Sequence, residues 1–366
     1  MTLKMLEGFK RAGHDQLAVT STWTDGEFNR RLKSIGIPEV RLPFGAFSKR
    51  FALKPMWWTV NFLIRLPWLW FGWSRVLRRF DPDVVVLTSS RIALPVYPWL
   101  AEKPSFMIEH SYLAPTRTRR FIYRLLARKL VAFVAVSKFM AGHLVHIGAP
   151  GSKVTVIHNG LVPKSDHAKD DKRTAEILSP HRRARIGIVG RIDSNKGHDL
   201  LVETLRRLKQ DGRNIEVYAF GQGDSRHIAM LSEKLAAYGL TSSWSWKGYE
   251  SDREAIYQQL DICVMPSTAE TFGLAAAEAS AREVPVIASN RGGLPEIIED
   301  GVTGSLINPD APDELYKKLC LLLDNPESAR RLGVEARKKM LREYNEEQMI
   351  AGYEELFCKA IGQSKL

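Results

Sequence analysis

The feature that most constrains the fold is a regular alternation of short apolar runs with helical patterns along the chain. The apolar runs are rich in Val, Ile and Ala, and the stretches between them have the periodicity of amphipathic helices. Strands that are apolar on both faces are typical of a parallel sheet that helices cover on both sides. The sequence therefore predicts an α/β protein. Its predicted strands are residues 16–22, 82–90, 104–111, 131–137, 153–162, 184–192, 215–223, 243–249, 261–267 and 284–290.

A length of 366 residues and one break in this pattern predict two domains. The break is the polar segment 163–183, which has no periodicity and is interpreted as an interdomain linker. Two strongly helical stretches, 312–342 and 345–361, close the chain. We expect both domains to be doubly wound and Rossmann-like, with ligands beyond the C-terminal strand ends. The predicted parts are an N-terminal domain at 1–160, a linker at 161–183, a C-terminal domain at 184–344 and a helix at 345–366 that crosses back to the first domain.

Positive charge is concentrated in the first half of the chain. Residues 1–160 contain 24 Lys and Arg against 9 Asp and Glu, a net charge of +15, whereas the remaining residues carry 29 against 32. This asymmetry indicates that the first domain meets a polyanionic partner, either anionic lipid or nucleic acid. The alternative is a basic surface that serves only solubility. No nucleic-acid-binding motif occurs, so we expect no nucleic acid as a partner.

The cysteines and the start of the chain indicate a cytoplasmic protein. Cys263, Cys320 and Cys358 are far apart and fit neither a disulfide framework nor a metal-binding spacing. This arrangement suits a reducing compartment. Residues 1–15 carry charges where a secretory signal needs an apolar core.

The loop after predicted strand 184–192 has the residues of a phosphate site. Gly190 and Arg191 follow the strand, and Lys196 and Gly197 come directly before a helical pattern. A glycine turn, two cations and a helix N-terminus together suit a diphosphate. The spacing is not that of a Walker or dinucleotide-binding motif, and an ion pair of Arg191 with a surface carboxylate is the alternative.

A second loop, "PSTAETFGLAAAEASA", places two carboxylates around an anion site. Phe272, Gly273 and Leu274 open an Ala-rich helix whose first amides can hold an anion. Glu270 precedes that helix and Glu278 lies within it. Because a phosphate would repel a carboxylate, both side chains are better suited to accept hydrogen bonds from hydroxyls. This pattern fits a diphosphate with a sugar at each end, although a solvated helix face is the alternative for Glu278.

These motifs, taken together, resemble the retaining nucleotide-sugar glycosyltransferases of family 4, which have the GT-B fold. The resemblance covers residues 130–345 and rests on Gly190–Lys196, on the paired glutamates, on 284–315 and on 136–160. It implies two Rossmann-like domains facing across a cleft. It also implies that Glu278 binds the nucleotide ribose and Glu270 the donor-sugar hydroxyls. Arg191 and Lys196 would neutralise the diphosphate, and the amides of 272–274 would contact sugar or phosphate.

The first domain supplies one further candidate and one departure from the family pattern. His110 follows predicted strand 104–111, and similar enzymes carry a histidine there, near the transferred sugar. A structural histidine is the alternative, and the role of neighbouring Glu109 is less defined. Family members usually begin with a strand and a Gly-rich loop. This chain is expected to begin inside the helix that follows them, so that either the sequence starts late or the sheet lacks that first strand. An extended start is expected to increase activity.

Two other patterns lie outside these motifs. Asp81 and Asp83 imitate a metal-binding Asp-x-Asp pair, but they precede a predicted strand, at the wrong end of the sheet for a site, and are interpreted as a turn. Gly221 and Gly223 look like a family loop and are equally compatible with a plain strand–helix turn. No metal and no cofactor is therefore expected.

The resemblance implies transfer of a hexose-type unit from a nucleotide diphosphate sugar to an acceptor hydroxyl with retention. No carboxylate stands out as a covalent nucleophile, which favours front-face attack assisted by the leaving phosphate. Two alternatives stay open for the same fold: a sugar-nucleotide epimerase, and an inactive protein that binds a nucleotide sugar.

Residues 55–79 combine tryptophans with Lys and Arg. Asn61, Arg65 and Pro67 interrupt the apolar run, so a membrane span is disfavoured. A buried helix and an interfacial segment that lies against anionic lipid both fit. We predict the second, with the first domain on the inner face of the plasma membrane and a lipid-linked or surface-polysaccharide glycan as acceptor. The predicted membrane contacts are Trp57, Trp58, Trp68, Trp70 and Trp73.

Overall fold

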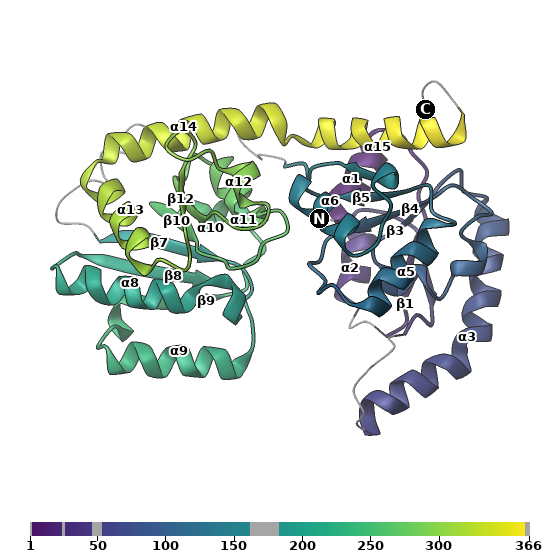
Figure 1. Ribbon diagram of the computed structural model, residues 1–366, viewed down its shortest axis with the longest axis horizontal. Helices are drawn as coiled ribbons and strands as arrows, with labels where there is room; N and C mark the ends of the chain where they lie inside the picture. Colours follow the sequence, from purple (N-terminus) through teal and green to yellow (C-terminus); the bar gives the residue numbers. More distant parts are fainter. Residues whose placement is uncertain (1, 24–25, 46–52, 162–182, 363–366) are drawn as a thin grey trace. The chain divides into compact units, whose positions relative to one another are not determined.

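The chain divides into two compact units (Figure 1). Unit 1 contains residues 1–136, 140–160 and 346–366, and unit 2 contains residues 137–139 and 161–345. The computed structural model describes residues 2–23, 26–45, 53–161 and 183–362, without the side chains of 53–56 and 58. The predicted linker, apart from its two end residues, lies outside the described residues.

Unit 2 is built on a parallel sheet with strand order β12-β11-β10-β7-β8-β9 in the part of the chain that the structure describes. Buried Ile, Val and Leu side chains of the sheet and of its helices form one core. The strands are β7 Ala184–Val189, β8 Ile215–Phe220, β9 Trp244–Gly248, β10 Ile262–Met265, β11 Val286–Ser289 and β12 Ser305–Ile307. The helices are η3 Ser194–Lys196, α8 His198–Gln210, α9 Ser225–Ala237, η4 Thr241–Ser243, α10 Arg253–Tyr257, α11 Leu274–Ser280, α12 Leu294–Ile297, α13 Pro312–Asp324 and α14 Pro326–Glu343.

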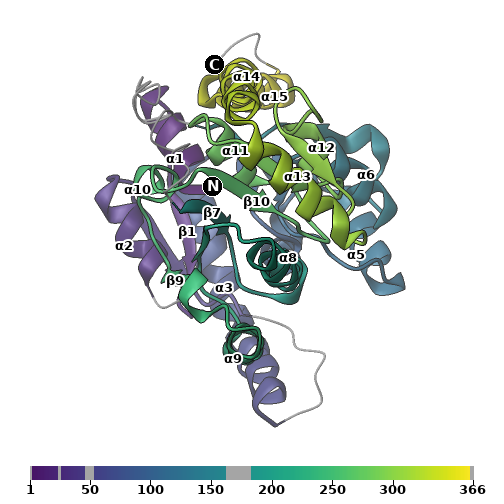
Figure 2. The same cartoon turned by 90° about the vertical axis from the view of Figure 1, so that its left-hand side faces the viewer.

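The sheet of unit 2 is doubly wound. The chain runs from β7 outward to β9, and then returns to the other side of β7 and runs from β10 outward to β12. Because crossovers between parallel strands are right-handed, the two directions place their helices on opposite faces. Figure 2 shows α8 and α9 on one side of the sheet and α11 and α14 on the other. The predicted α/β class is confirmed.

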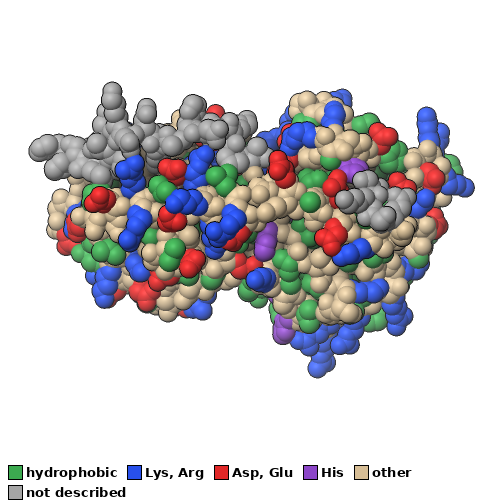
Figure 3. Space-filling view, turned by 90° about the horizontal axis from the view of Figure 1, so that it is seen from above, with side chains coloured by type: hydrophobic (Ala, Val, Ile, Leu, Met, Phe, Trp, Pro, Cys, Tyr) green, Lys and Arg blue, Asp and Glu red, His purple; other side chains and the backbone are tan. Residues whose placement is uncertain are grey.

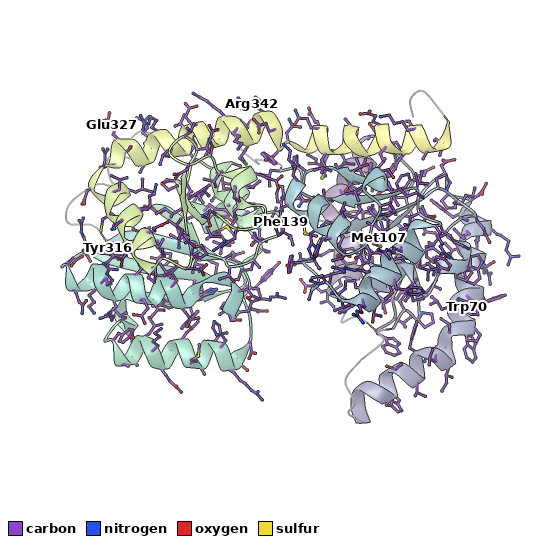
Figure 4. All side chains as sticks on the ribbon, viewed as in Figure 1. Trp70, Met107, Phe139, Tyr316, Glu327 and Arg342 are labelled. Atoms are coloured by element: carbon purple, nitrogen blue, oxygen red, sulfur yellow. The ribbon has the colours of Figure 1, made fainter. Side chains whose placement is uncertain are left out.

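Unit 1 also has parallel strands. β1 and β2 form a pair, and β3-β4-β5-β6 form a sheet in chain order. The strands are β1 Ala18–Ser21, β2 Glu39–Leu42, β3 Val85–Leu87, β4 Ser105–Glu109, β5 Ala132–Ala135 and β6 Val154–Val156. The helices are α1 Thr2–Arg11, α2 Glu27–Ser34, α3 Leu53–Phe80, α4 Ser90–Ala93, η1 Tyr97–Trp99, α5 Arg117–Ala127, α6 Lys138–His146, η2 Gly151–Lys153 and α15 Glu346–Ile361. Met107, labelled in Figure 4, lies in the buried strand β4.

The last helix of the chain belongs to unit 1, where α15 packs against α1. The ring of Phe9 lies 5.8 Å from that of Tyr353 and 5.9 Å from that of Phe357. Arg11 forms an ion pair with Glu346. A Cβ at Gly8 would collide with Ile350, so the two helices approach more closely than a larger residue would allow.

The structure differs from the prediction at three elements. The helical stretch 312–342 is two helices, since Pro326 has no amide hydrogen and the Asn325 side chain accepts from Ser328 N–H at 3.0 Å to cap a new helix. The other two elements are β2 and β12, which the sequence did not predict. Both are short and lack the long apolar run of the predicted strands.

Candidate functional site

The site of unit 2 lies at the switch point of its sheet. β10 pairs with β7 through Ile262 and Ile186, although the chain visits two other strands between them. The loops that follow these two strands therefore diverge to opposite faces, and in open α/β sheets ligands bind in the crevice that such loops leave. These loops are 190–197 and 266–273, the two that the sequence marks as phosphate and sugar sites.

The two loops are fixed to each other by backbone contacts. Thr268 N–H donates to Asn195 O at 2.9 Å. Gly197 has a φ of +75°, and a Cβ at this position would collide with the carbonyl of Pro266. Because only glycine tolerates both constraints, the loop that carries Lys196 is held against the end of β10.

The most informative contact of the site joins Lys196 and Glu270. Lys196 Nζ lies 2.6 Å from Glu270 Oε2, and both side chains are mostly buried. Glu270 Oε1 also accepts from the N–H of Thr271 at 3.2 Å. The sequence predicts these residues as neighbours of one ligand, and the structure brings them into direct contact. A ligand can replace this ion pair, because an anionic group can bind the ammonium of Lys196 while hydroxyl groups donate hydrogen bonds to the carboxylate of Glu270.

Arg191 is placed differently from Lys196. Its side chain is 75% exposed, and its Nε donates to Asp193 Oδ2 at 2.7 Å. Asp193 also accepts from Asn195 N–H at 3.0 Å and caps η3. The alternative from the sequence, an ion pair of Arg191 with a carboxylate, is therefore present, and this carboxylate belongs to Asp193 of the same loop.

Glu278 is buried in the short helix α11, with 4% of its surface exposed. The Tyr257 hydroxyl lies 3.2 Å from Glu278 Oε2 and 3.1 Å from Ala275 O, so its one hydrogen is shared between these acceptors. Arg253 Nε lies 3.3 Å from the same carboxylate oxygen of Glu278. Burial raises the pKa of Tyr257 well above its usual range, so the phenol stays a donor. A solvated helix face, the alternative for Glu278, is therefore wrong. The sequence did not reveal Tyr257 or Arg253, because only the fold brings α10 to α11.

Phe272, Gly273 and Leu274 lead from β10 into α11. The Phe272 ring is buried and packs edge-on against Tyr344 at 5.8 Å, so it is a packing residue while its backbone stays in the loop. A third loop, from β11, supports them: Gly293 N–H donates to Glu270 O at 3.0 Å. A Cβ at Gly292 would collide with that same carbonyl.

In unit 1, His110 directly follows β4. Burial lowers its pKa to about 4, so the imidazole is neutral at neutral pH. The neighbouring Glu109 is buried as well, and burial raises its pKa. Its carboxylate accepts from Tyr123 Oη at 2.7 Å and from Ser111 N–H at 3.2 Å, which ties the loop after His110 to the sheet.

The interpretation of Asp81 as a turn residue agrees with its surroundings. Asp81 has a φ of +47° at the end of α3 and pairs with Lys103 at 2.6 Å. Gly221 lies so close to Gly190 O that a Cβ would collide with it. Among the described residues, no group of three or more His, Cys, Asp or Glu side chains is arranged to hold a metal ion.

Comparison with known proteins assigns this architecture to a class. Residues 1–164 match the family model described as Glycosyltransferase Family 4, and residues 169–339 match the model Glycosyl transferases group 1. A structure of the protein Alr3699/HepE of Anabaena aligns with 97% of this chain and 94% of its own, with a TM-score of 0.77 and 17% identity. The fold is therefore GT-B. The two family models, one after the other, support a family-4-type glycosyltransferase.

Two curated relatives are similar to parts of this chain, and one of them is a glycosyltransferase. An uncharacterized 41.2 kDa protein in the cps region of Klebsiella pneumoniae is 31% identical over 192 residues, 51% of either chain. A D-inositol 3-phosphate glycosyltransferase of Segniliparus rotundus is 29% identical over 209 residues, 55% of this chain and 46% of its own. The matches thus span about half the length of these relatives.

Proposed function

We propose that the protein is a retaining glycosyltransferase that moves a sugar from a nucleotide diphosphate sugar to an acceptor hydroxyl. The observation that carries the proposal is the contact of Lys196 with Glu270 at the switch point of unit 2. A cation next to a carboxylate suits a sugar joined to a diphosphate, because the anionic and the hydroxyl groups of this ligand are neighbours. The structural neighbour from Anabaena, solved with UDP and glucose and with UDP-glucose, supports the same ligand class.

The proposed chemistry depends on stabilising the departing diphosphate. The bond from the anomeric carbon to the β-phosphate oxygen breaks while a bond to the acceptor oxygen forms on the same face. The acceptor proton passes to the departing phosphate oxygen. Negative charge grows on the diphosphate during this step, and Lys196 and Arg191 are the fixed cations that stabilise it. These side chains supply the positive charge without a metal or a cofactor.

Donor binding rearranges the resting ion pair in this proposal. When the diphosphate takes the ammonium of Lys196, the carboxylate of Glu270 is released to accept hydrogen bonds from sugar hydroxyls. The backbone of 272–274 lies next to Glu270 and contacts sugar or phosphate. At the other end of the donor, Glu278 accepts from the ribose hydroxyls, and Tyr257 fixes its orientation.

Unit 1 handles the acceptor in this proposal. The neutral imidazole of His110 accepts or donates one hydrogen bond near the transferred sugar without adding charge. We propose a lipid-linked or surface-polysaccharide glycan as acceptor, on the cytoplasmic face of the membrane. A relative encoded in a cps region and the basic character of residues 1–160 support this choice.

The test starts with donor alone. Calorimetry with UDP and UDP-glucose measures binding, and proton NMR of the same mixture follows the donor over time. Slow release of UDP and glucose supports a transferase. Addition of a membrane extract should accelerate the release of UDP while the glucose is transferred to an acceptor, which yields an α-linked product from the α-linked donor. Appearance of an epimer without acceptor would indicate an epimerase instead. Binding with no turnover of any sugar in a nucleotide-sugar panel would indicate an inactive binding protein.

A further inference from the structure

The helix α3 has one buried side. Phe62, Leu69, Trp73 and Leu77 are buried and recur at helical spacing. The ring of Trp73 packs edge-on against Phe44 with 6.0 Å between centroids. This side attaches α3 to the rest of unit 1, so Trp73 is a core residue and does not lie on the surface that the sequence assigned to it.

The opposite side of α3 is apolar and exposed. Its large side chains are between 53% and 65% exposed, and they follow one another at spacings of three and four residues, which places them in one stripe. They are Trp57, Val60, Ile64, Trp68 and Phe71. Pro67 stands inside the helix, and Figure 1 shows that α3 bends along its length at the edge of unit 1. Monomeric proteins rarely expose a continuous apolar stripe of this kind without a partner.

Arginines extend the line of the apolar stripe toward the C-terminal end of α3. Arg75 and Arg78 follow Phe71 at the same spacing, and Arg79 is adjacent. The chain from residue 40 to residue 80 contains no Asp or Glu. Figure 3 shows clusters of Lys and Arg side chains at the margins of unit 1. A face with exposed aromatic rings, aliphatic side chains and unbalanced cations is therefore present on α3.

We propose that this face of α3 docks unit 1 on an anionic bilayer surface. Indole rings prefer the headgroup region, aliphatic side chains enter the acyl boundary, and the arginines bind lipid phosphates. A second copy of the chain is a poorer occupant, because pairing two α3 helices would bring their arginines together without any carboxylate on either helix. Among the described residues, no helix is long and apolar enough to cross a membrane.

The structure refines which tryptophans take part. Trp57 and Trp68 lie on the exposed stripe. Trp70, labelled in Figure 4, is held by the body of unit 1: its Nε1 donates to Pro95 O at 2.9 Å, and its ring lies 5.7 Å from that of Trp99. The side chain of Trp58 lies outside the described residues. We therefore assign insertion to Trp57 and Trp68, with Trp70 at the margin.

This docking deepens the proposed function, since a bilayer brings the enzyme to a lipid-linked acceptor. Its test needs neither donor nor acceptor, so it can fail while glycosyl transfer stands. The full chain is mixed with phosphatidylcholine vesicles, with or without phosphatidylglycerol, and sedimented. The wild-type protein should pellet with the anionic vesicles, show a blue shift of tryptophan emission and dissociate as salt rises.

Two sets of substitutions separate the apolar from the ionic contribution. Trp57→Ser, Trp68→Ser and Phe71→Ser together should lower the partition coefficient by about 100-fold and abolish the blue shift. Arg75→Gln, Arg78→Gln and Arg79→Gln together should lower it by roughly 100-fold for anionic vesicles only. The matched control is Leu321→Ser with Val302→Ser, two exposed apolar residues of unit 2, which should bind as the wild type does.

Thermal melting and far-UV circular dichroism verify that each variant is folded. Wild-type protein that stays in the supernatant at low salt would overturn the proposal, as would variants of the stripe that bind like the wild type. Sedimentation velocity gives a further outcome. This outcome is a wild-type dimer that does not bind vesicles and that Trp68→Ser converts to a monomer. Such a result would assign the exposed face of α3 to a second copy of the chain and overturn the proposal of membrane docking.

Discussion

The cations of the two units are arranged in opposite ways. In unit 2, each cation near the switch point has a carboxylate within ion-pair distance. On α3 of unit 1, the arginines lie on a helix without any acidic residue. The pairs of unit 2 are Arg191–Asp193, Lys196–Glu270 and Arg253–Glu278.

This difference separates two kinds of recognition. Paired groups are held in position before the ligand arrives, so they can exchange partners for a small molecule whose charges and hydroxyls are fixed in space. Unbalanced cations act through their field on a partner whose charges are spread over a surface. The same residue types thus serve a defined donor site in unit 2 and a diffuse docking face in unit 1.

The strongest test of the paired arrangement removes Lys196. Lys196→Ala should lower the turnover of UDP-glucose by about 100- to 1,000-fold, the usual effect of one electrostatic group on a transition state. The loss should appear in kcat, because charge on the diphosphate grows only as the bond breaks. Lys318→Ala is the control, since Lys318 forms an ordinary surface pair with Asp300 at 3.3 Å. Equal turnover of Lys196→Ala and wild type would reject the diphosphate site.

Each unit contains a histidine whose pKa is lowered by burial, a feature that the two units therefore have in common. Burial lowers the pKa of His198, at the start of α8, to about 4, as it does for His110 in unit 1. The unfolded chain binds these protons more readily than the folded one, so stability is complete above the ordinary pKa of 6.5 and is lost as pH falls toward 4. His198 alone should cost about 3 kcal/mol at pH 4.

Urea denaturation across this pH range measures the effect. His198→Leu should flatten the fall in unfolding free energy, whereas His146→Leu, at an exposed position of α6, should leave the slope as it is. A variant of His198 with the wild-type slope would show that the acid sensitivity arises elsewhere.

A smaller effect is expected at the nucleotide end of the site. Tyr257→Phe removes one hydrogen bond to the buried carboxylate of Glu278 and should weaken UDP binding by roughly tenfold. Calorimetry measures this, and kcat at saturating donor should stay near that of the wild type. Tyr316→Phe is the matched control, because Tyr316 donates to Asp211 on the exposed side of unit 2. Unchanged affinity of Tyr257→Phe would contradict the assignment of Glu278 to the ribose.

The last prediction concerns metal removal, for which we expect no effect on turnover. If Lys196 and Arg191 supply the positive charge of the donor site, then EDTA should leave turnover unchanged. Activity lost with EDTA and restored by a divalent cation would show that the side-chain charges are insufficient by themselves.

The sequence predicted the layered fold well because its signals are local. Buried parallel strands such as β7 and β10 are continuous apolar runs, and each lies inside its predicted range. Short elements were missed: β12 has only three residues, too few for a pattern. The division at Asn325 and Pro326 was visible in the residues but was overridden by the helical pattern on either side.

The sequence predicted which residues belong to the candidate site, but it did not predict which of them contact one another. Glu270 and Lys196 carry a loop signal each, but their ion pair joins positions 74 residues apart. The sequence also did not show which tryptophans of α3 are buried and which are exposed. Both sides of that helix are apolar, so no periodicity in the sequence distinguishes the buried Trp73 from the exposed Trp68.

The packing of α15 on α1 has a consequence for the synthesis of the protein. Unit 1 is begun first, yet the helix that covers Phe9 follows the whole of unit 2 in the chain and is translated after it. Phe106 of the buried strand β4 is covered by the same helix, since its ring lies 4.9 Å from that of Phe357. Unit 1 therefore cannot complete this part of its core until the segment that forms unit 2 has been translated.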